Sequence, residues 1–74
     1  MHYDYSALCG KIVEKFQNRK NFATALGITP ESLGKKLNSV RDFKQSEIES
    51  AVMLLEIRVD DIGKYFFTLK VQNN

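Results

Sequence analysis

The sequence of 74 residues has few of the residues on which several protein classes depend: one cysteine, one histidine, one proline, four glycines and no tryptophan. A single cysteine, Cys9, excludes an intrachain disulfide scaffold and suits a reducing cytoplasm. One histidine and one cysteine cannot supply the four protein ligands of a structural zinc site. No apolar run approaches the ~18 residues of a membrane span, and no signal-peptide pattern is present, so we expect no membrane partner.

Catalytic groups are equally scarce. The length suits one domain, residues 1–74, and is too short for a large enzyme with a deep substrate cleft. A histidine-based nucleophile triad cannot be assembled, and no motif brings the scattered serines and aspartates together. We therefore expect a binding protein that is not an enzyme and that has no cofactor or metal.

The charge is distributed unevenly. Residues 10–44 contain eight Lys and Arg against three Asp and Glu, whereas residues 45–74 contain three against five. The net charge of +2 therefore conceals a basic first half and an acidic second half. Such asymmetry is a weak indication that one face binds a polyanion.

Helical periodicity dominates the first half of the chain. Asp4 can cap a first helix, Asn18 a second that ends at Gly27, and Thr29 a third that begins at Pro30. The third helix ends at Asn38. The apolar stripe of the first helix contains Tyr5, Leu8, Cys9, Ile12, Val13 and Phe16.

A fourth helix is expected at about residues 45–56. Ser46 and Glu49 form a possible capping box, but an earlier start is also open. A short last helix begins near Asp60, and residues 67–72 then alternate apolar and polar, as in a strand. This tail either packs on the helices, pairs with the tail of another molecule or stays loose.

The predicted core combines the apolar faces of these helices. Cys9 is expected to be buried there as a small hydrophobic side chain. Phe43 is expected to plug the core from a polar loop. The other residues expected to be buried are Leu8, Ile12, Phe16, Ala23, Leu26, Ile28, Leu33, Val52, Leu55, Ile62 and Phe66.

Residues 18–37 have the spacing of a helix-turn-helix motif. Ala23 is small where the second helix of the motif crosses it, Gly27 makes the tight turn, and Ile28 fills the core behind that turn. Leu33 and Leu37 anchor the second helix, which leaves its outer face free for a major groove.

Residues 16–37 resemble the Cro and XRE-like helix-turn-helix repressors of bacteriophages, with residues 22–29 at the centre of the match. The chain is similar, more narrowly, to short Cro-like proteins of Gram-positive prophages. Those share Phe-Lys-Gln-Ser-Glu-Ile-Glu, here at 43–49, Tyr-Phe-Phe, here at 65–67, and Lys-Val-Gln, here at 70–72. The resemblance implies an all-α, five-helix Cro/lambda-repressor-like domain with a short extended C-terminal tail, residues 67–74. It also implies a dimeric, DNA-binding transcriptional regulator in the cytoplasm of a bacterial host.

At two positions the sequence departs from the usual pattern of these Cro-like proteins. Gly34 occupies a solvent-facing position of the third helix where the family often has a reading side chain. Lys36 stands where relatives usually have a small or apolar residue.

The residues expected to contact operator DNA form two groups. Base edges are expected to be read by Thr29, Glu31, Ser32 and Lys35. Phosphates are expected to be contacted by Arg19, Lys20, Lys36, Asn38, Ser39 and Arg41. The alternatives are a plain N-cap for Thr29, a helix-dipole partner for Glu31, and solvated side chains for the others.

The aromatic tail has its own two interpretations. Three adjacent aromatics, residues 65–67, point in different directions, so at least one should lie at the surface. The residues therefore either complete the core or form an interface, which would be that of a homodimer. The candidate interface residues are Tyr65, Phe67, Leu69 and Val71.

Two functions remain open. The leading hypothesis is a Cro-like repressor that reads double-stranded operator DNA through the helix starting at Thr29. The alternative is an antirepressor or modulator that binds a partner phage repressor and blocks its DNA-binding face. Gly34, Glu31 and the modest net charge favour this alternative.

Overall fold

A computed structural model describes residues 2–71 of the chain, and five α-helices with one short 3-10 helix account for most of them. The order is α1 (Ser6–Phe16), α2 (Arg19–Leu26), α3 (Pro30–Leu37), α4 (Gln45–Leu54), η1 (Val59–Asp61) and α5 (Ile62–Phe66). The all-α, five-helix prediction is confirmed. The predicted tail extends beyond this range, because residues 72–74 lie outside the described part.

The helix boundaries follow from local hydrogen bonds. The Asp4 carboxylate accepts from the backbone N–H of Ser6 at the start of α1. The Asn18 side chain accepts from Asn21 N–H before α2, and the Thr29 hydroxyl accepts from Ser32 N–H before α3. The predicted caps of α2 and α3 are therefore present, whereas the N-cap position of α1 is Tyr5 and Asp4 lies one residue before it.

The start of α4 corrects one expectation. The helix begins at Gln45, and the Glu47 carboxylate accepts from the backbone N–H of Lys44 at 2.8 Å. Glu47, at the third helical position, thus performs the role that the pair of Ser46 and Glu49 was expected to perform. Of the two starts that the sequence allowed for this helix, the structure has the earlier one.

The core lies where α1, α2, α4 and α5 face one another, with α3 attached along one side. Phe22, Leu33 and Phe66 are among the largest fully buried side chains. Seven residues expected to be buried are only partly so, because they lie at the rim of this core and pack against it from outside. These are Cys9, Phe16, Leu26, Ile28, Phe43, Val52 and Ile62.

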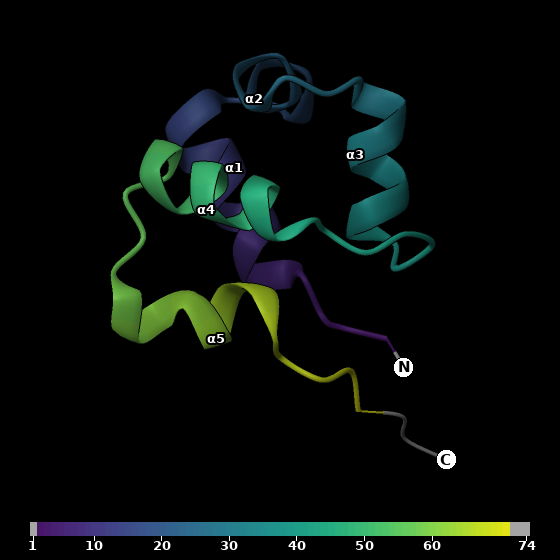
Figure 1. The fold of residues 1–74 in the computed structure, drawn as a ribbon, viewed down its shortest axis with the longest axis vertical. Helices are drawn as coiled ribbons and strands as arrows, with labels where there is room; N and C mark the ends of the chain where they lie inside the picture. The colour runs from purple at the N-terminus through teal and green to yellow at the C-terminus, as the bar shows by residue number, and fades with distance from the viewer. Residues whose placement is uncertain (1, 72–74) are drawn as a thin grey trace.

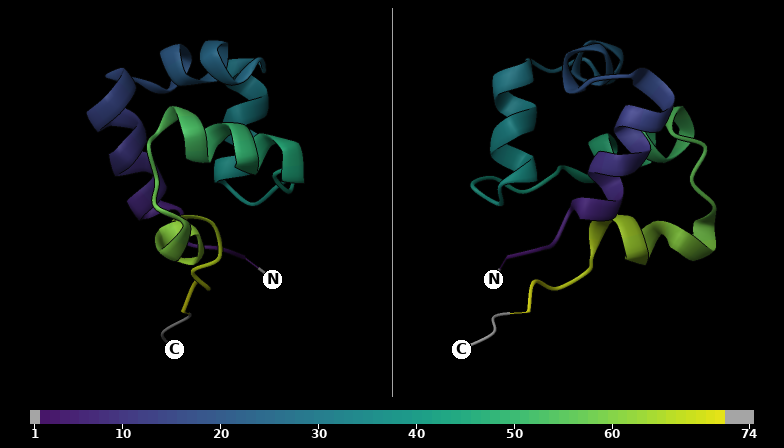
Figure 2. Two further views of the ribbon diagram at one scale, coloured as in Figure 1. Left: turned by 60° about the vertical axis from the view of Figure 1, so that its left-hand side comes forward. Right: turned by 180° about the vertical axis from the view of Figure 1, so that it is seen from behind.

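The arrangement leaves two elements prominent. Figures 1 and 2 show α2 crossing one end of the molecule and α3 running down its side, while α5 lies at the opposite end. Both chain ends leave the fold beside α5, on the side of α3. The helix-turn-helix face and the terminal segments are therefore the two features that position candidate binding surfaces.

The terminal segments pair with each other. Tyr3 and Leu69 form an isolated antiparallel bridge, with hydrogen bonds from Asp4 N–H to the Thr68 carbonyl (2.7 Å) and from Lys70 N–H to the His2 carbonyl (3.0 Å). The sequence suggested three arrangements of the tail, and pairing with the N-terminal segment of the same chain was not one of them.

Candidate regulatory interface

The turn between α2 and α3 has the geometry of the predicted motif. Gly27 ends α2 with φ of 84°, a left-handed conformation that glycine adopts without steric cost. The next residue, Ile28, donates its backbone N–H to the Ala23 carbonyl at 3.0 Å. Ala23 and Leu33, one on each helix, are both fully buried, as the spacing of the motif predicts.

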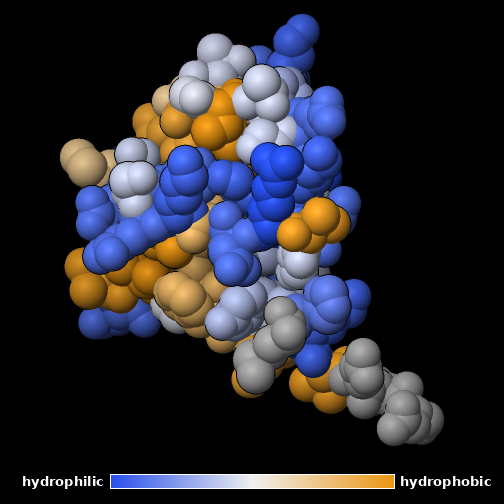
Figure 3. Space-filling view, turned by 45° about the vertical axis from the view of Figure 1, so that its right-hand side comes forward, coloured by the Kyte–Doolittle hydropathy of each residue, from blue (hydrophilic) through white to orange (hydrophobic). Residues whose placement is uncertain are grey.

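The outer face of α3 contains a compensated charge pair. The Lys35 ammonium lies 3.5 Å from a Glu31 carboxylate oxygen, one helical turn away. The Glu31 side chain is 82% exposed, whereas the Lys35 side chain is half-exposed. Of the residues expected to read bases, Thr29 and Glu31 are exposed and Ser32 and Lys35 are intermediate, and all four lie along the first two turns of the helix. Figure 3 shows this side of the molecule, where hydrophilic side chains alternate with apolar patches.

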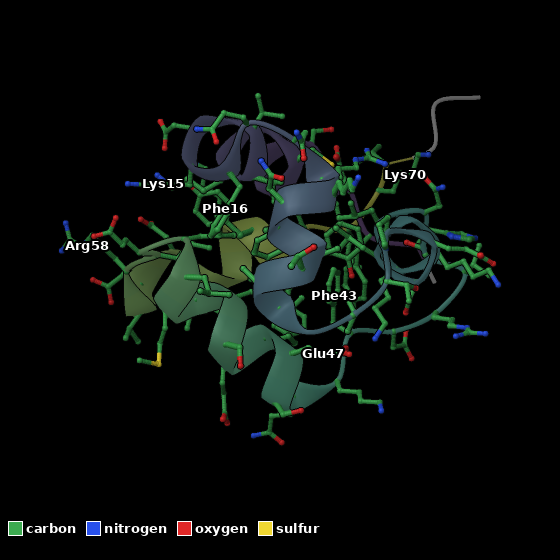
Figure 4. All side chains as sticks on the ribbon, turned by 90° about the horizontal axis from the view of Figure 1, so that it is seen from above. Lys15, Phe16, Phe43, Glu47, Arg58 and Lys70 are labelled. Atoms are coloured by element: carbon green, nitrogen blue, oxygen red, sulfur yellow. The ribbon has the colours of Figure 1, made fainter. Side chains whose placement is uncertain are left out.

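Lys36 is not on the outward face, which corrects its assignment as a phosphate contact. Its side chain is 6% exposed, and its ammonium donates to both carboxylate oxygens of Glu47, at 2.5 and 2.6 Å. Glu47 projects from α4 in Figure 4. The Lys36 ammonium is therefore engaged in a buried ion pair that joins α3 to α4 and does not face solvent.

The charge state of this pair follows from its surroundings. Burial raises the pKa of Glu47, but the hydrogen bonds from Lys36 and from the Lys44 backbone outweigh burial and hold the pKa below its ordinary value of 4.5. The carboxylate is thus ionised at neutral pH. The pair adds no net charge to the surface around α3.

The remaining cations of the motif lie at its periphery. Arg19, Lys20 and Arg41 are exposed, as phosphate contacts require. The Arg19 guanidinium approaches the Cys9 thiol at 3.5 Å. Cys9 is partly exposed, in contrast to its expected burial, because it lies at the edge of the α1 stripe beside this guanidinium.

Two predicted phosphate contacts follow α3, and one of them is engaged within the chain. Asn38 is exposed. The Ser39 hydroxyl accepts from the Tyr3 N–H at 3.3 Å and donates to the Tyr3 carbonyl at 3.5 Å. Ser39 therefore fastens the N-terminal segment to the loop after α3, a role that was not predicted.

The tail contributes to a row of aromatic rings as well as to the surface. The Tyr3 ring meets the Phe67 ring edge-on at 5.8 Å, and Phe43 meets both Tyr5 (5.4 Å) and Phe66 (5.5 Å) in the same manner. Figure 4 shows Phe43 pointing inward among the helices. The predicted plug is thus confirmed as a residue packed against the core.

The four candidate interface residues differ in exposure. Tyr65 is partly buried, whereas Phe67 and Leu69 are about half exposed and Val71 is 78% exposed. Sequence reasoning missed their neighbour Tyr3. The alternation of polar and apolar residues at positions 2–5 was a signal that could have indicated a second extended segment.

Two hollows flank the paired termini. One, of about 410 Å³, is lined mainly by polar residues of the N-terminal segment and by the end of α3, with Cys9 and Lys70. The other, of about 250 Å³, is lined by the aromatic row together with Asp42 and Ile48. Within residues 2–71, no group of three or more His, Cys, Asp or Glu side chains is placed to hold a metal ion. No helix in this same range has the length and apolar character needed to cross a bilayer.

Comparisons with known proteins gave one family match and one structural match. The profile of a family described as "Protein of unknown function (DUF739)" matches residues 1–69. The chain is also similar to a protein of known solution structure, the modulator of repression (MOR) of the temperate bacteriophage TP901-1 from Lactococcus lactis. The two sequences are 47% identical. The two structures align over 97% of each chain with a TM-score of 0.79. No curated protein sequence matches. The family match is thus to DUF739 rather than to the Cro and XRE-like repressors that the sequence resembles.

Proposed function

We propose that this chain, which belongs to the DUF739 family, is a phage regulatory protein that modulates a partner repressor. The proposal is based on the charges of its surface and on its structural relative. The proposed action is to bind that repressor and cover its DNA-binding face. The proposed activity is binding, with no catalytic step. This is the second of the two functions that the sequence leaves open.

The observation that carries the proposal is the charge compensation of α3. Lys35 is paired with Glu31 and Lys36 with Glu47, so both cations of the helix that would enter a major groove have an acidic partner. DNA affinity depends on cations that neutralise phosphates. A repressor's DNA-binding face is itself basic, and the exposed Glu31 carboxylate complements such a face.

The structural relative supports the same choice. Its printed description is a modulator of repression, and the 47% identity extends over nearly the whole of both chains. A helix-turn-helix fold that acts on repression through protein contacts would keep the shape of the motif while losing the cationic surface of its second helix. The present chain has both properties.

Direct operator binding is the second candidate, because one group of side chains favours it. Arg19 and Lys20 lie in the first turn of α2, and Arg41 follows α3, all three exposed. A helix N-terminus flanked by cations is suited to a phosphate. These residues could hold DNA even though α3 contributes little charge.

Glu31→Gln tests the proposed contact, because only the modulator function predicts that repressor binding depends on this carboxylate. If Glu31 meets a basic repressor face, the variant should weaken repressor binding by up to about fivefold. If α3 instead lies on DNA, operator preference should fall where Glu31 reads a base edge, and DNA binding should tighten where the carboxylate only repels phosphate. Glu49→Gln is the matched control, since Glu49 is an exposed carboxylate on α4, outside the residues of the motif.

The experiment is a titration of the purified protein against its own promoter DNA, with and without the neighbouring repressor, and against the repressor alone. Capture of the repressor without operator preference at any salt concentration supports the modulator. Operator preference by the protein alone, lost in Lys35→Ala, would overturn it in favour of the repressor function.

A further inference from the structure

The paired terminal segments form a short antiparallel ribbon of residues 2–4 and 68–70. The two hydrogen bonds flank the Tyr3–Leu69 pair, so these two residues form a non-hydrogen-bonded pair of the ladder. In such a pair the backbone N–H and C=O groups of both residues point away from the ribbon, toward its two outer edges.

The two edges differ. At the edge formed by residues 2–4, the Ser39 hydroxyl occupies both outward groups of Tyr3. At the opposite edge, no hydrogen bond within residues 2–71 involves the N–H or C=O of Leu69. One edge is therefore closed, and the other presents backbone groups that a further strand can pair with.

The ribbon also has two unlike faces. Tyr3 shares a face with Leu69, its cross-strand partner, and with Phe67, whose ring it contacts edge-on at 5.8 Å. Strand alternation places Val71 on this same face and Thr68 and Lys70 on the other. Phe67 is 51%, Leu69 53% and Val71 78% exposed, so much of the apolar face is uncovered.

We propose that residues 67–71 pair, antiparallel and edge to edge, with the same segment of a second copy of this chain. The pairing is centred on Leu69, so that the two Leu69 residues exchange N–H and C=O hydrogen bonds. The Val71 N–H of each copy then donates to the Phe67 carbonyl of the other. The result is a four-stranded sheet with the closed Ser39 edges on the outside.

The side chains favour this register and favour a second copy of the chain as the pairing strand. On the apolar face Leu69 lies opposite Leu69 and Phe67 opposite Val71, an aromatic and β-branched pair of the kind that stabilises sheets. On the other face Lys70 lies opposite Thr68, whereas a register centred on Lys70 would oppose two ammonium groups. A two-fold interface requires such self-complementarity, which the sequence of the segment provides.

The first test is the oligomeric state of the protein alone, measured by sedimentation equilibrium. Wild type should show a monomer–dimer equilibrium, and Leu69→Lys should raise the dissociation constant by at least about tenfold by placing two cations opposite each other. Val13→Lys is the matched control, because Val13 is also half exposed (56%) but lies on α1 outside the ribbon. It should leave the equilibrium within about twofold of wild type.

The second test fixes the register through cysteine crosslinking in a Cys9→Ser background, with helicity checked by circular dichroism. Leu69→Cys should form an intermolecular disulfide, since directly opposed residues of a ladder lie within disulfide range. Lys70→Cys, one residue away, should not.

Two outcomes would overturn the proposal: a wild-type protein that stays monomeric up to about 1 mM, or equal crosslinking of the two cysteine variants. If the wild type is monomeric and Leu69→Lys also weakens repressor binding, the open edge is assigned to a strand of the repressor instead. Because dimerisation is measured without DNA or repressor, its failure leaves the proposed function untouched, and the reverse also holds.

Discussion

The ammonium group of Lys36 lies 2.5 Å from a carboxylate oxygen of Glu47, and this buried contact connects α3 to α4. The same carboxylate accepts from the Lys44 N–H at 2.8 Å, so it also defines where α4 begins. The Glu47 side chain therefore both binds the inner side of α3 and stabilises the start of α4. The Lys36–Glu47 pair positions α3 for the candidate interface, and we do not expect the pair itself to contact a binding partner.

Lys36→Met should destabilise the protein by about 3 kcal/mol, because it leaves the Glu47 carboxylate enclosed without its cation. Lys35→Met is the matched control. Lys35 is adjacent in sequence, but its partner Glu31 is 82% exposed, and such a pair contributes less than about 1 kcal/mol. Urea denaturation of both variants measures the difference, and equal losses would contradict the structural role of the buried pair.

Acid should weaken the fold in a way that depends on Glu47. Its pKa is lowered on folding, so its stabilising contribution is present above the ordinary value of 4.5 and is lost as pH falls through the lower folded value. Urea midpoints measured between about pH 5 and pH 3 should fall steeply for wild type and less steeply for Glu47→Gln.

The control for this pH dependence is Glu56→Gln. The pKa of Glu56 is also lowered, through its hydrogen bond with Lys15, but that pair is on the surface. At about 0.5 M salt the contribution of Glu56 should be screened, whereas that of Glu47 should persist. A wild-type slope that salt removes completely would show that the buried pair is not its source.

The helices and their caps were predictable because their causes are local. Asn18, Gly27 and Thr29 each act within four residues of the helix end that they define, and the apolar spacing of α1 and α2 is visible in the sequence. The helix-turn-helix packing followed from the same local pattern.

The site was harder to predict because its determinants are distant in sequence. Lys36 and Glu47 are eleven positions apart, and a pattern of charges does not show which cation is buried. One signal was available: the resembling family has small or apolar residues at the position of Lys36, which indicates an inward-facing site. The pairing of Tyr3 with Leu69 spans almost the whole chain, and only the matching two-residue alternation of both segments pointed to it.

Ala23→Leu should overpack the crossing of α2 and α3 and cost about 1–3 kcal/mol. Ala23 is fully buried, so added methyl groups must displace its neighbours. Ala25→Leu is the control, since Ala25 is exposed on the same helix and should change stability by less than about 0.5 kcal/mol. Thermal or urea unfolding that ranks the two variants equally would place the crossing elsewhere.

Two glycines of the motif should respond to alanine in opposite directions. Gly27→Ala should destabilise by about 1 kcal/mol, because φ of 84° strains any residue with a β-carbon even though open space surrounds the site. Gly34→Ala should stabilise by up to about 1 kcal/mol, because Gly34 lies inside α3 and an added β-carbon meets nothing within 4 Å apart from its chain neighbours and the backbone of its own helix.

The two glycine variants also report on the interface when stability is measured together with repressor binding. Gly34 lies between Glu31 and Lys35 in the sequence of α3, so a partner that contacts this face closely must approach the glycine backbone. Gly34→Ala should then weaken repressor binding while raising the urea midpoint, a combination that loss of folding cannot produce. Gly27→Ala should lower the midpoint and affect binding only as far as it unfolds the protein. If Gly34→Ala binds the repressor as wild type does, the partner does not pack against this part of α3.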